Sequence, residues 1–319
     1  MTIIKPFRFG IINERALSGL RWQAHVRQIE ELGFDTLLLR DHIVPDYFGD
    51  QYAPIAALAM AAAITSRLHV GSLVLDNDYR HPAFLAKEAA TIDALSGGRF
   101  ELGLGAGWLR VEYAAAGLPF ESAGTRISRL EESLTIMRGL FSGETVDFQG
   151  QHYQITGLRN FPASVRPGGP PILIGAGQRR MLQLAGREAD ILGLLTTSVA
   201  SGAMVDDTSE RTAGAVEQKL AWVREGAGAR YDSIELSLIP SLLITDERRA
   251  RTEQLIRERG WGATSVEEVW AMPSVLIGSL DEIVATVEER RARYGFSYFI
   301  FSDDQLAEAA ALVTRLRGR

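Results

Sequence analysis

The sequence predicts a (β/α)8 TIM barrel, and three observations support this fold class. Short apolar segments alternate with stretches of helical period along the whole chain, and eight such segments can be counted. Most of them are nearly continuous apolar runs, which is typical of parallel strands buried on both faces. The glycine-rich segments lack the complete dinucleotide-binding fingerprint, which disfavours a doubly wound sheet. We expect a single domain over residues 1–319.

The eight predicted strands are rich in β-branched and apolar residues. They are Phe7–Ile12, Phe34–Leu39, Leu68–Leu75, Phe100–Leu104, Pro171–Gly175, Ile191–Leu195, Ile234–Ile244 and Phe296–Phe301. Amphipathic stretches such as Leu20–Leu32 and Ile127–Leu140 predict helices between the strands, and the chain closes on the helical pattern Gln305–Arg317.

Several segments depart from this alternation. Thr145–Ile155 alternates apolar and polar residues around a Gln-Gly pair, which predicts a β-hairpin inserted between helix 4 and strand 5. Arg166–Pro171 predicts a stiff turn before the fifth strand. Thr196–Thr212 is rich in Ser, Thr, Gly and Asp, and predicts a mobile loop over the barrel mouth. Gly260–Met272 is expected to be a second long mouth loop that contributes to substrate specificity.

Composition excludes several classes of site and partner. The chain has no cysteine, so it forms neither disulfides nor thiolate metal sites. Its net charge of −6 comes from interspersed charges without a basic stripe, and we expect no nucleic-acid or membrane partner. No apolar run approaches the roughly 18 residues that span a bilayer, and the N-terminus lacks a signal pattern. We therefore predict a cytoplasmic location.

One predicted helix, Ala53–Ile64, carries no charge on any face, whereas an outer barrel helix is normally polar outside. Two interpretations are open: the chain's own loops cover it, or it forms the interface of a homodimer. We favour the homodimer.

The carboxyl ends of barrel strands build the active site in this fold class. Asp41 and His42 follow the second strand, where they could transfer a proton or position a polar substrate; a histidine that only caps a loop is the alternative. The third strand is followed by a polar loop that contains Asp76, Asn77 and Arg80, before a helix that begins near Pro82.

The fourth strand carries glycines two residues apart, which share one face of the strand. Gly103, Gly105 and Gly107 therefore leave a face without side chains, either to hold a flat ring or to pack against an aromatic neighbour. Trp108 follows at the rim, where it could stack on a ligand or close the barrel.

The fifth strand ends in a glycine-rich turn that enters a helix. Such a turn, here Gly175, Ala176 and Gly177, offers free backbone N–H groups to a phosphate. Arg179 and Arg180 in the first helical turn oppose the helix dipole, which indicates a bound anion; solvated arginines are the alternative. A flat ring with a phosphate anchor describes a flavin-like cofactor. His25, His69 and His152 show no metal-ligand spacing, and we expect no metal.

Four runs resemble the luciferase-like monooxygenase superfamily, and more narrowly its branch of coenzyme F420-dependent oxidoreductases. They are Gly33–His42, Arg80–Pro82, Gly103–Trp108 and Pro170–Gly177. The resemblance implies a barrel that binds F420 or FMN, dimers formed through the helices after strands two and three, and a non-prolyl cis peptide at Leu73-Val74. It implies contacts to the ring and phosphate from Leu73, Val74, Asp76, Asn77, Arg80, Gly105, Ala106, Gly107, Trp108, Gly175, Ala176, Gly177, Arg179 and Arg180.

The resemblance implies an oxidoreductase that transfers a hydride between coenzyme F420 and a small organic substrate. His42 would be the proton donor or acceptor, and Asp41 would orient it or contact the ring. The alternatives are an FMN-dependent monooxygenase supplied by a flavin reductase and a non-catalytic flavin-binding protein. A metal-dependent hydrolase is disfavoured. The family's sugar-phosphate dehydrogenases have a catalytic Glu where this chain has Trp108, which disfavours that reaction.

Overall fold

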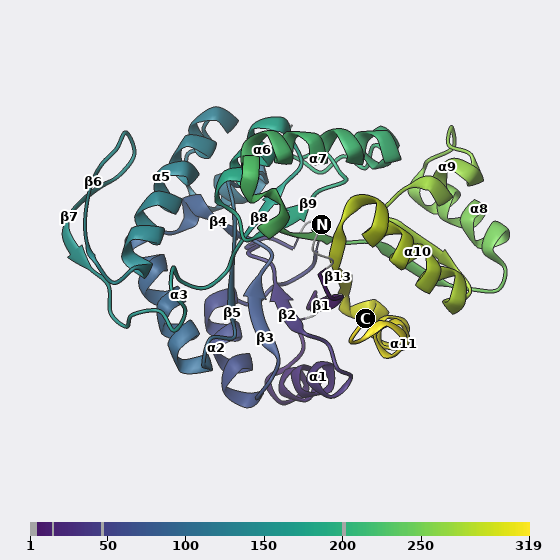
Figure 1. Cartoon of the computed structure of the whole chain (residues 1–319), viewed down its shortest axis with the longest axis horizontal. Helices are drawn as coiled ribbons and strands as arrows, with labels where there is room; N and C mark the ends of the chain where they lie inside the picture. Colours follow the sequence, from purple (N-terminus) through teal and green to yellow (C-terminus); the bar gives the residue numbers. More distant parts are fainter. Residues whose placement is uncertain (1–4, 15, 46–47, 200–201) are drawn as a thin grey trace.

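The computed structural model describes residues 5–14, 16–45, 48–199 and 202–319, and it confirms the predicted fold class (Figure 1). Every strand pair of the main sheet is parallel, and a pairing between β3 and β5 closes the sheet into a barrel. The short strand β4 (Leu75–Asp76) follows β3 and also pairs with β5. The barrel strands are β1 (Arg8–Ile12), β2 (Thr36–Leu39), β3 (His69–Ser72), β5 (Phe100–Gly105), β8 (Ile172–Ala176), β9 (Ile191–Leu194), β10 (Glu235–Leu238) and β13 (Phe296–Ser302).

Helices cover the outside of the barrel. The outer helices are α1 (Gly19–Glu31), α2 (Pro54–Ile64), α3 (Pro82–Ser96), α5 (Ala123–Phe141), α6 (Arg179–Glu188), α7 (Ala213–Ala227), α10 (Leu280–Tyr294) and α11 (Leu306–Leu316), which follows the last strand. The sequence analysis missed the short helix α4 (Arg110–Ala116), which lies between β5 and α5 and contributes to the site described below. No helix in the described part of the chain is long and apolar enough to cross a membrane.

The predicted hairpin is confirmed: β6 (Thr145–Gln149) and β7 (Gln154–Arg159) pair in antiparallel fashion between α5 and β8. It projects from the barrel on the side opposite α8 and α9 (Figure 1).

The structure corrects two predictions in the C-terminal third. The predicted strand Ile234–Ile244 is broken after Leu238, because Pro240 has no backbone N–H to continue the ladder. The second part, β11 (Ser241–Ile244), pairs with a missed strand, β12 (Val275–Gly278), outside the main sheet. The segment expected to be a loop, Gly260–Met272, contains the helix α9 (Val266–Ala271), which follows α8 (Arg248–Arg259) and begins at a capping box between Ser265 and Glu268.

The strands divide their side chains between two cores. Residues such as Leu37, Phe299 and Phe301 face the helices and belong to the large outer core. Alternate residues, including Leu38 and Ile300, form a smaller cluster inside the barrel. Because this inner cluster fills only part of the barrel, space remains at the carboxyl ends of the strands.

Candidate active site

An open cavity occupies the carboxyl ends of the barrel strands. Its volume is about 1260 Å³ when the solvent space at its open mouth is included. Most of the residues singled out from the sequence line it: Asp41, His42, Leu73, Val74, Asp76, Gly105, Ala106, Gly107, Trp108, Gly175, Ala176 and Gly177. Asn77, Arg80, Arg179 and Arg180 are not part of the lining.

His42 is held in place by a carboxylate that the sequence analysis did not identify. Its Nδ1 lies 3.0 Å from Oε2 of Glu112, and its ring stacks on Phe48 with centroids 4.8 Å apart. With Nδ1–H donated to the Glu112 carboxylate, Nε2 is the ring nitrogen that can exchange a proton with a molecule in the cavity. The resemblance implied that Asp41 orients His42 or contacts the ring. Glu112 holds His42 in this structure, and ring contact by Asp41, which lines the cavity, stays a prediction.

Glu112 is the acceptor of several hydrogen bonds. The backbone N–H groups of Ile43 and Val44 donate to its Oε1, at 2.6 and 3.3 Å, and the Tyr79 hydroxyl donates to Oε2 at 3.2 Å. Burial alone would raise the pKa of Glu112, but the hydrogen bonds from His42 and from the two amides outweigh it and lower the pKa. Glu112 is thus an ionised anchor that fixes both the His42 ring and the loop after it.

Asp41 has a different partner from the one expected. Its carboxylate forms a paired contact with the Arg80 guanidinium, in which Nη2 of Arg80 donates to Oδ1 at 2.9 Å. Oδ2 also accepts from the backbone N–H of Asp76 at 3.0 Å. Arg80 therefore acts behind the cavity wall: it holds Asp41, which itself lines the cavity.

The glycines of the fourth predicted strand serve two different purposes. A Cβ on Gly103 would lie 1.8 Å from the Ser72 carbonyl oxygen, so this glycine permits close approach of β3 and β5 and opens no space. A Cβ on Gly105 would lie 2.7 Å from Cγ2 of Val74, and one on Gly175 would lie 3.4 Å from Cγ1. Val74 thus fills the room that these two glycines leave, and together they form an apolar floor of the cavity.

The peptide bond between Leu73 and Val74 is cis, as the family resemblance implied. It links β3 to β4 and lies where the chain enters the cavity floor.

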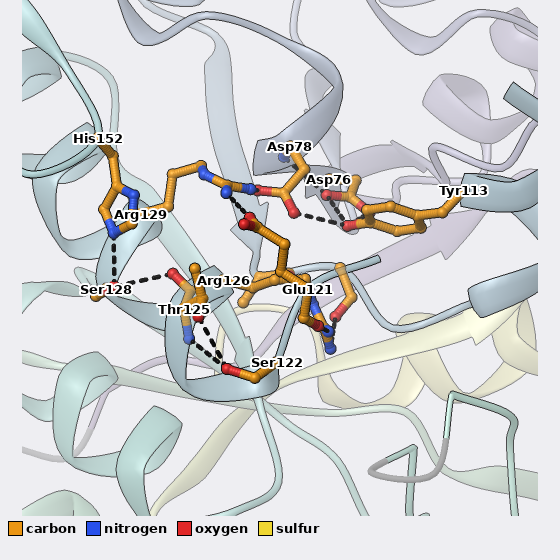
Figure 2. Close-up of polar contacts among 12 residues, drawn as sticks. Asp76, Asp78, Tyr113, Glu121, Ser122, Thr125, Arg126, Ser128, Arg129 and His152 are labelled. Atoms are coloured by element: carbon orange, nitrogen blue, oxygen red, sulfur yellow. Dashed lines mark hydrogen bonds and ion pairs between the residues drawn. The ribbon is translucent and has the colours of Figure 1, made fainter. Parts of the chain in front are cut away.

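A buried carboxyl group, Asp76, also lines the cavity, and Figure 2 shows it next to the Tyr113 hydroxyl and Asp78. The Tyr113 hydroxyl, on α4, lies 2.8 Å from Oδ2 of Asp76 and 3.1 Å from Oδ2 of Asp78. Asp78 is in turn paired with Arg129 at 2.8 Å, whereas Asp76 has no ion-pair partner of its own in the described structure. Burial raises the pKa of Asp76 to about 7, since the hydrogen bonds from Asp78 N–H and Tyr113 offset only part of the lost hydration.

The two arginines that were read as a sign of a bound anion are ion-paired on the surface. Arg179 lies 3.2 Å from Glu225 and Arg180 lies 3.1 Å from Glu131, and both side chains are about half exposed. They need no bound anion to explain them, so the solvated-arginine alternative describes them better. The turn before them, which contains Gly177, does line the cavity at the start of α6.

The segment Thr196–Thr212 lies at the cavity, as expected of a mouth loop. Thr197, Val199 and Met204 contribute to the lining, and an antiparallel bridge joins Ser198 to Val205. Ala200 and Ser201 lie outside the described residues.

Other lining residues went unnoticed in the sequence. Phe48, Leu109, Met181, Ser237 and Ile239 come from separate segments. Glu112 alone carried a signal that could have been used, because it is an acid one helical turn after Trp108. Among the described residues, no group of three or more His, Asp and Glu side chains could hold a metal ion.

The fold and this cavity agree with the comparison to known proteins. The model of the luciferase-like monooxygenase family matches residues 18–271, and the chain belongs to this family. A relative from Nakamurella multipartita, named F420-dependent glucose-6-phosphate dehydrogenase, is 31% identical over 94% of this chain and 84% of its own length. One of the same name from Intrasporangium calvum is 36% identical, over 54% of this chain and about half (52%) of its own length.

Solved structures support the fold. The coenzyme F420 dependent tetrahydromethanopterin reductase from Methanopyrus kandleri superposes with a TM-score of 0.71 at 20% identity, with 98% of both chains covered. The family predicted from the four sequence runs is therefore confirmed.

Proposed function

We propose that this protein is a coenzyme F420-dependent oxidoreductase that transfers a hydride between the deazaflavin and a small organic substrate. One observation carries the proposal: His42, fixed by Glu112, borders a barrel-mouth cavity whose floor is apolar. The names of the two relatives, which both specify F420, support the choice of cofactor.

The residues present fit a flat cofactor. Val74, Gly105 and Gly175 give a floor on which an apolar ring face can lie, and any larger residue at Gly105 would meet Val74. The backbone of Gly177 and Gln178 at the start of α6 would hold the phosphate. When bound, the deazaflavin supplies the hydride chemistry.

The protein's own contribution is to position the reactants and move a proton. Glu112 fixes the tautomer of His42, so that Nε2 accepts the proton of a substrate hydroxyl or, protonated, returns one to a carbonyl oxygen. Trp108 approaches the His42 ring edge-on, with centroids 5.8 Å apart, and with Phe48 it restricts the motion of the imidazole. These neighbours also limit access of water to the reacting atoms.

The experiment that tests the cofactor is a parallel titration of the protein with F420 and with FMN, followed by tryptophan fluorescence. Trp108 lines the cavity and should be quenched by a bound ring. We expect preference for F420. Preference for FMN would favour the FMN-dependent monooxygenase, which requires a flavin reductase as partner, and binding of neither would refute the cofactor site.

We also propose that the protein forms a homodimer through α2 and α3. The outward face of α2 is apolar, with Ala56, Ala59, Met60 and Ala63 exposed, and Phe84 on α3 is 70% exposed. An uncharged exposed helix face of this kind is normally covered by a partner. The cytoplasmic location stays a prediction.

A further inference from the structure

The residues that line the cavity indicate which class of substrate it can hold, and the reaction class alone does not. Large apolar side chains make up much of the lining, among them Phe48, Trp108, Leu109, Val199 and Met204. The last two belong to the mouth loop, so a bound substrate would contact an apolar cover.

Positive charge in this lining is scarce. Among the described lining residues Arg40 is the sole arginine or lysine, and His42, which is charged only when protonated, is paired with Glu112. The Arg40 guanidinium donates to Oε1 of Glu14 from Nε at 3.0 Å and from Nη2 at 2.5 Å, and it also lies over the Phe48 ring. This arginine is therefore already neutralised.

The cations of the mouth loop and of the helix that follows it are also paired with carboxylates. Arg211 is paired with Asp206 at 2.5 Å and donates to the Thr196 hydroxyl. Lys219 is paired with Glu210 at 2.7 Å and donates to the carbonyl of Leu195. Both side chains are buried, so they support the loop and do not face a ligand.

Acidic groups, by contrast, do line the cavity. Asp41, Asp76 and Glu112 all contribute to it. Outside the amide turn that is assigned to the cofactor, a phosphate dianion would lie against an apolar wall and near carboxyl groups, without a free cation to replace its lost hydration. The relatives named for glucose 6-phosphate act on such a dianion, and Trp108 here adds a bulky apolar ring to the lining.

We infer that the substrate of this chain is a neutral, largely apolar organic molecule with one hydroxyl or carbonyl group, and not a sugar phosphate. This inference rests on the proposed function. His42 offers the polar contact for that single group, and the apolar lining holds the rest of the molecule.

The test compares matched ligands by calorimetry on the F420-loaded protein, so that the readout is binding and not turnover. Cyclohexanol and cyclohexyl phosphate share one apolar body and differ in charge, and glucose 6-phosphate is the third probe. We expect cyclohexanol to bind at least about tenfold more tightly than either phosphate. Equal or tighter binding of a phosphate, or no binding of cyclohexanol at millimolar concentration, overturns the inference.

The same design separates this inference from the proposed function. Failure of F420 to bind in the preceding titration refutes the cofactor assignment. The three ligands are then compared on the FMN-loaded protein, in which the cofactor covers the amide turn before α6. The charge discrimination is still expected there because it comes from the rest of the lining. Loss of that discrimination refutes the substrate class.

A pair of variants on the mouth loop provides the control. Val199→Lys places a cation in the lining, whereas Val205→Lys places one at a position that is 49% exposed and outside the lining. We expect Val199→Lys to weaken cyclohexanol binding several-fold and to strengthen cyclohexyl phosphate binding about tenfold, with neither change in Val205→Lys. If Val199→Lys alters neither affinity, the apolar lining does not select the substrate.

Discussion

Asp76 makes the pH dependence of stability a quantitative test of the site. Its pKa in the folded protein is about 7, against an ordinary value of 3.8, because burial disfavours its ionised form. Between these two values the folded protein keeps a proton that the unfolded chain has lost. The contribution of Asp76 to the free energy of unfolding is therefore full below about pH 4, and it is lost as the pH rises through 7.

The magnitude follows from the two pKa values. A difference of about 3 units at roughly 1.4 kcal/mol per unit gives up to about 4 kcal/mol of stability lost between low and high pH. Asp76→Asn places a neutral group of the same shape at this position and removes that loss. About 2 of these 3 units lie between pH 5 and pH 7, so we expect the stability of the variant relative to the wild type to rise by about 3 kcal/mol between about pH 5 and about pH 8.

The assay is urea unfolding of the wild type and of Asp76→Asn at both pH values, with the free energy of unfolding extrapolated to water. Asp281→Asn, at a side chain that is 79% exposed, controls for the change in net charge. A stability difference between the wild type and Asp76→Asn that stays constant with pH, or that shrinks as the pH rises, would refute the argument from burial.

Three further predictions concern the site and the surface. His42→Ala should reduce turnover by about 100-fold or more, while its affinity for F420 changes little. Glu112→Gln should reduce kcat less than His42→Ala does and should shift the pH profile of kcat. Stopped-flow and binding assays check the two variants, and unchanged turnover in His42→Ala would remove His42 from the mechanism. Gly107→Ala should destabilise the fold by roughly 2–4 kcal/mol, because φ is +72° and a Cβ would lie 1.9 Å from the Tyr113 hydroxyl. Gly117→Ala, at φ +70° with open space around it, should cost about 1 kcal/mol, and equal losses in the two would contradict the clash. Met60→Arg should produce monomers in sedimentation, with Leu158→Arg on the hairpin as the control; a persistent dimer would place the interface elsewhere.

Most of the barrel could be predicted from local pattern. Continuous apolar runs identified the strands because a parallel strand in a barrel is buried on both faces, whatever its neighbours are. The hairpin followed from the alternation within Thr145–Ile155, which the structure confirms apart from its exact ends. The strand β12 was not predicted, because it pairs with β11 outside the main sheet and so does not belong to the eightfold alternation that identified the barrel strands.

The site could be predicted only in part. Position after the second strand was enough to select Asp41 and His42, since barrel chemistry gathers at these ends. Their partners could not be selected in this way: Glu112 is 70 residues from His42, and Arg80 is 39 residues from Asp41. The sequence left a bound anion and solvated arginines open at Arg179 and Arg180, because the ion-pair partners of these residues lie on other helices.

The sequence by itself determined the fold class, the inserted hairpin and the segments that reach the barrel mouth. These properties depend on periodicity and on glycine placement, which act over a few residues. Only the tertiary structure decided which carboxylate holds His42, how Val74 fills the space beside Gly105, and that Arg40, the one arginine or lysine of the described lining, is already paired. Ion pairing and close packing depend on which strands become neighbours when the barrel closes, and no local pattern carries that information.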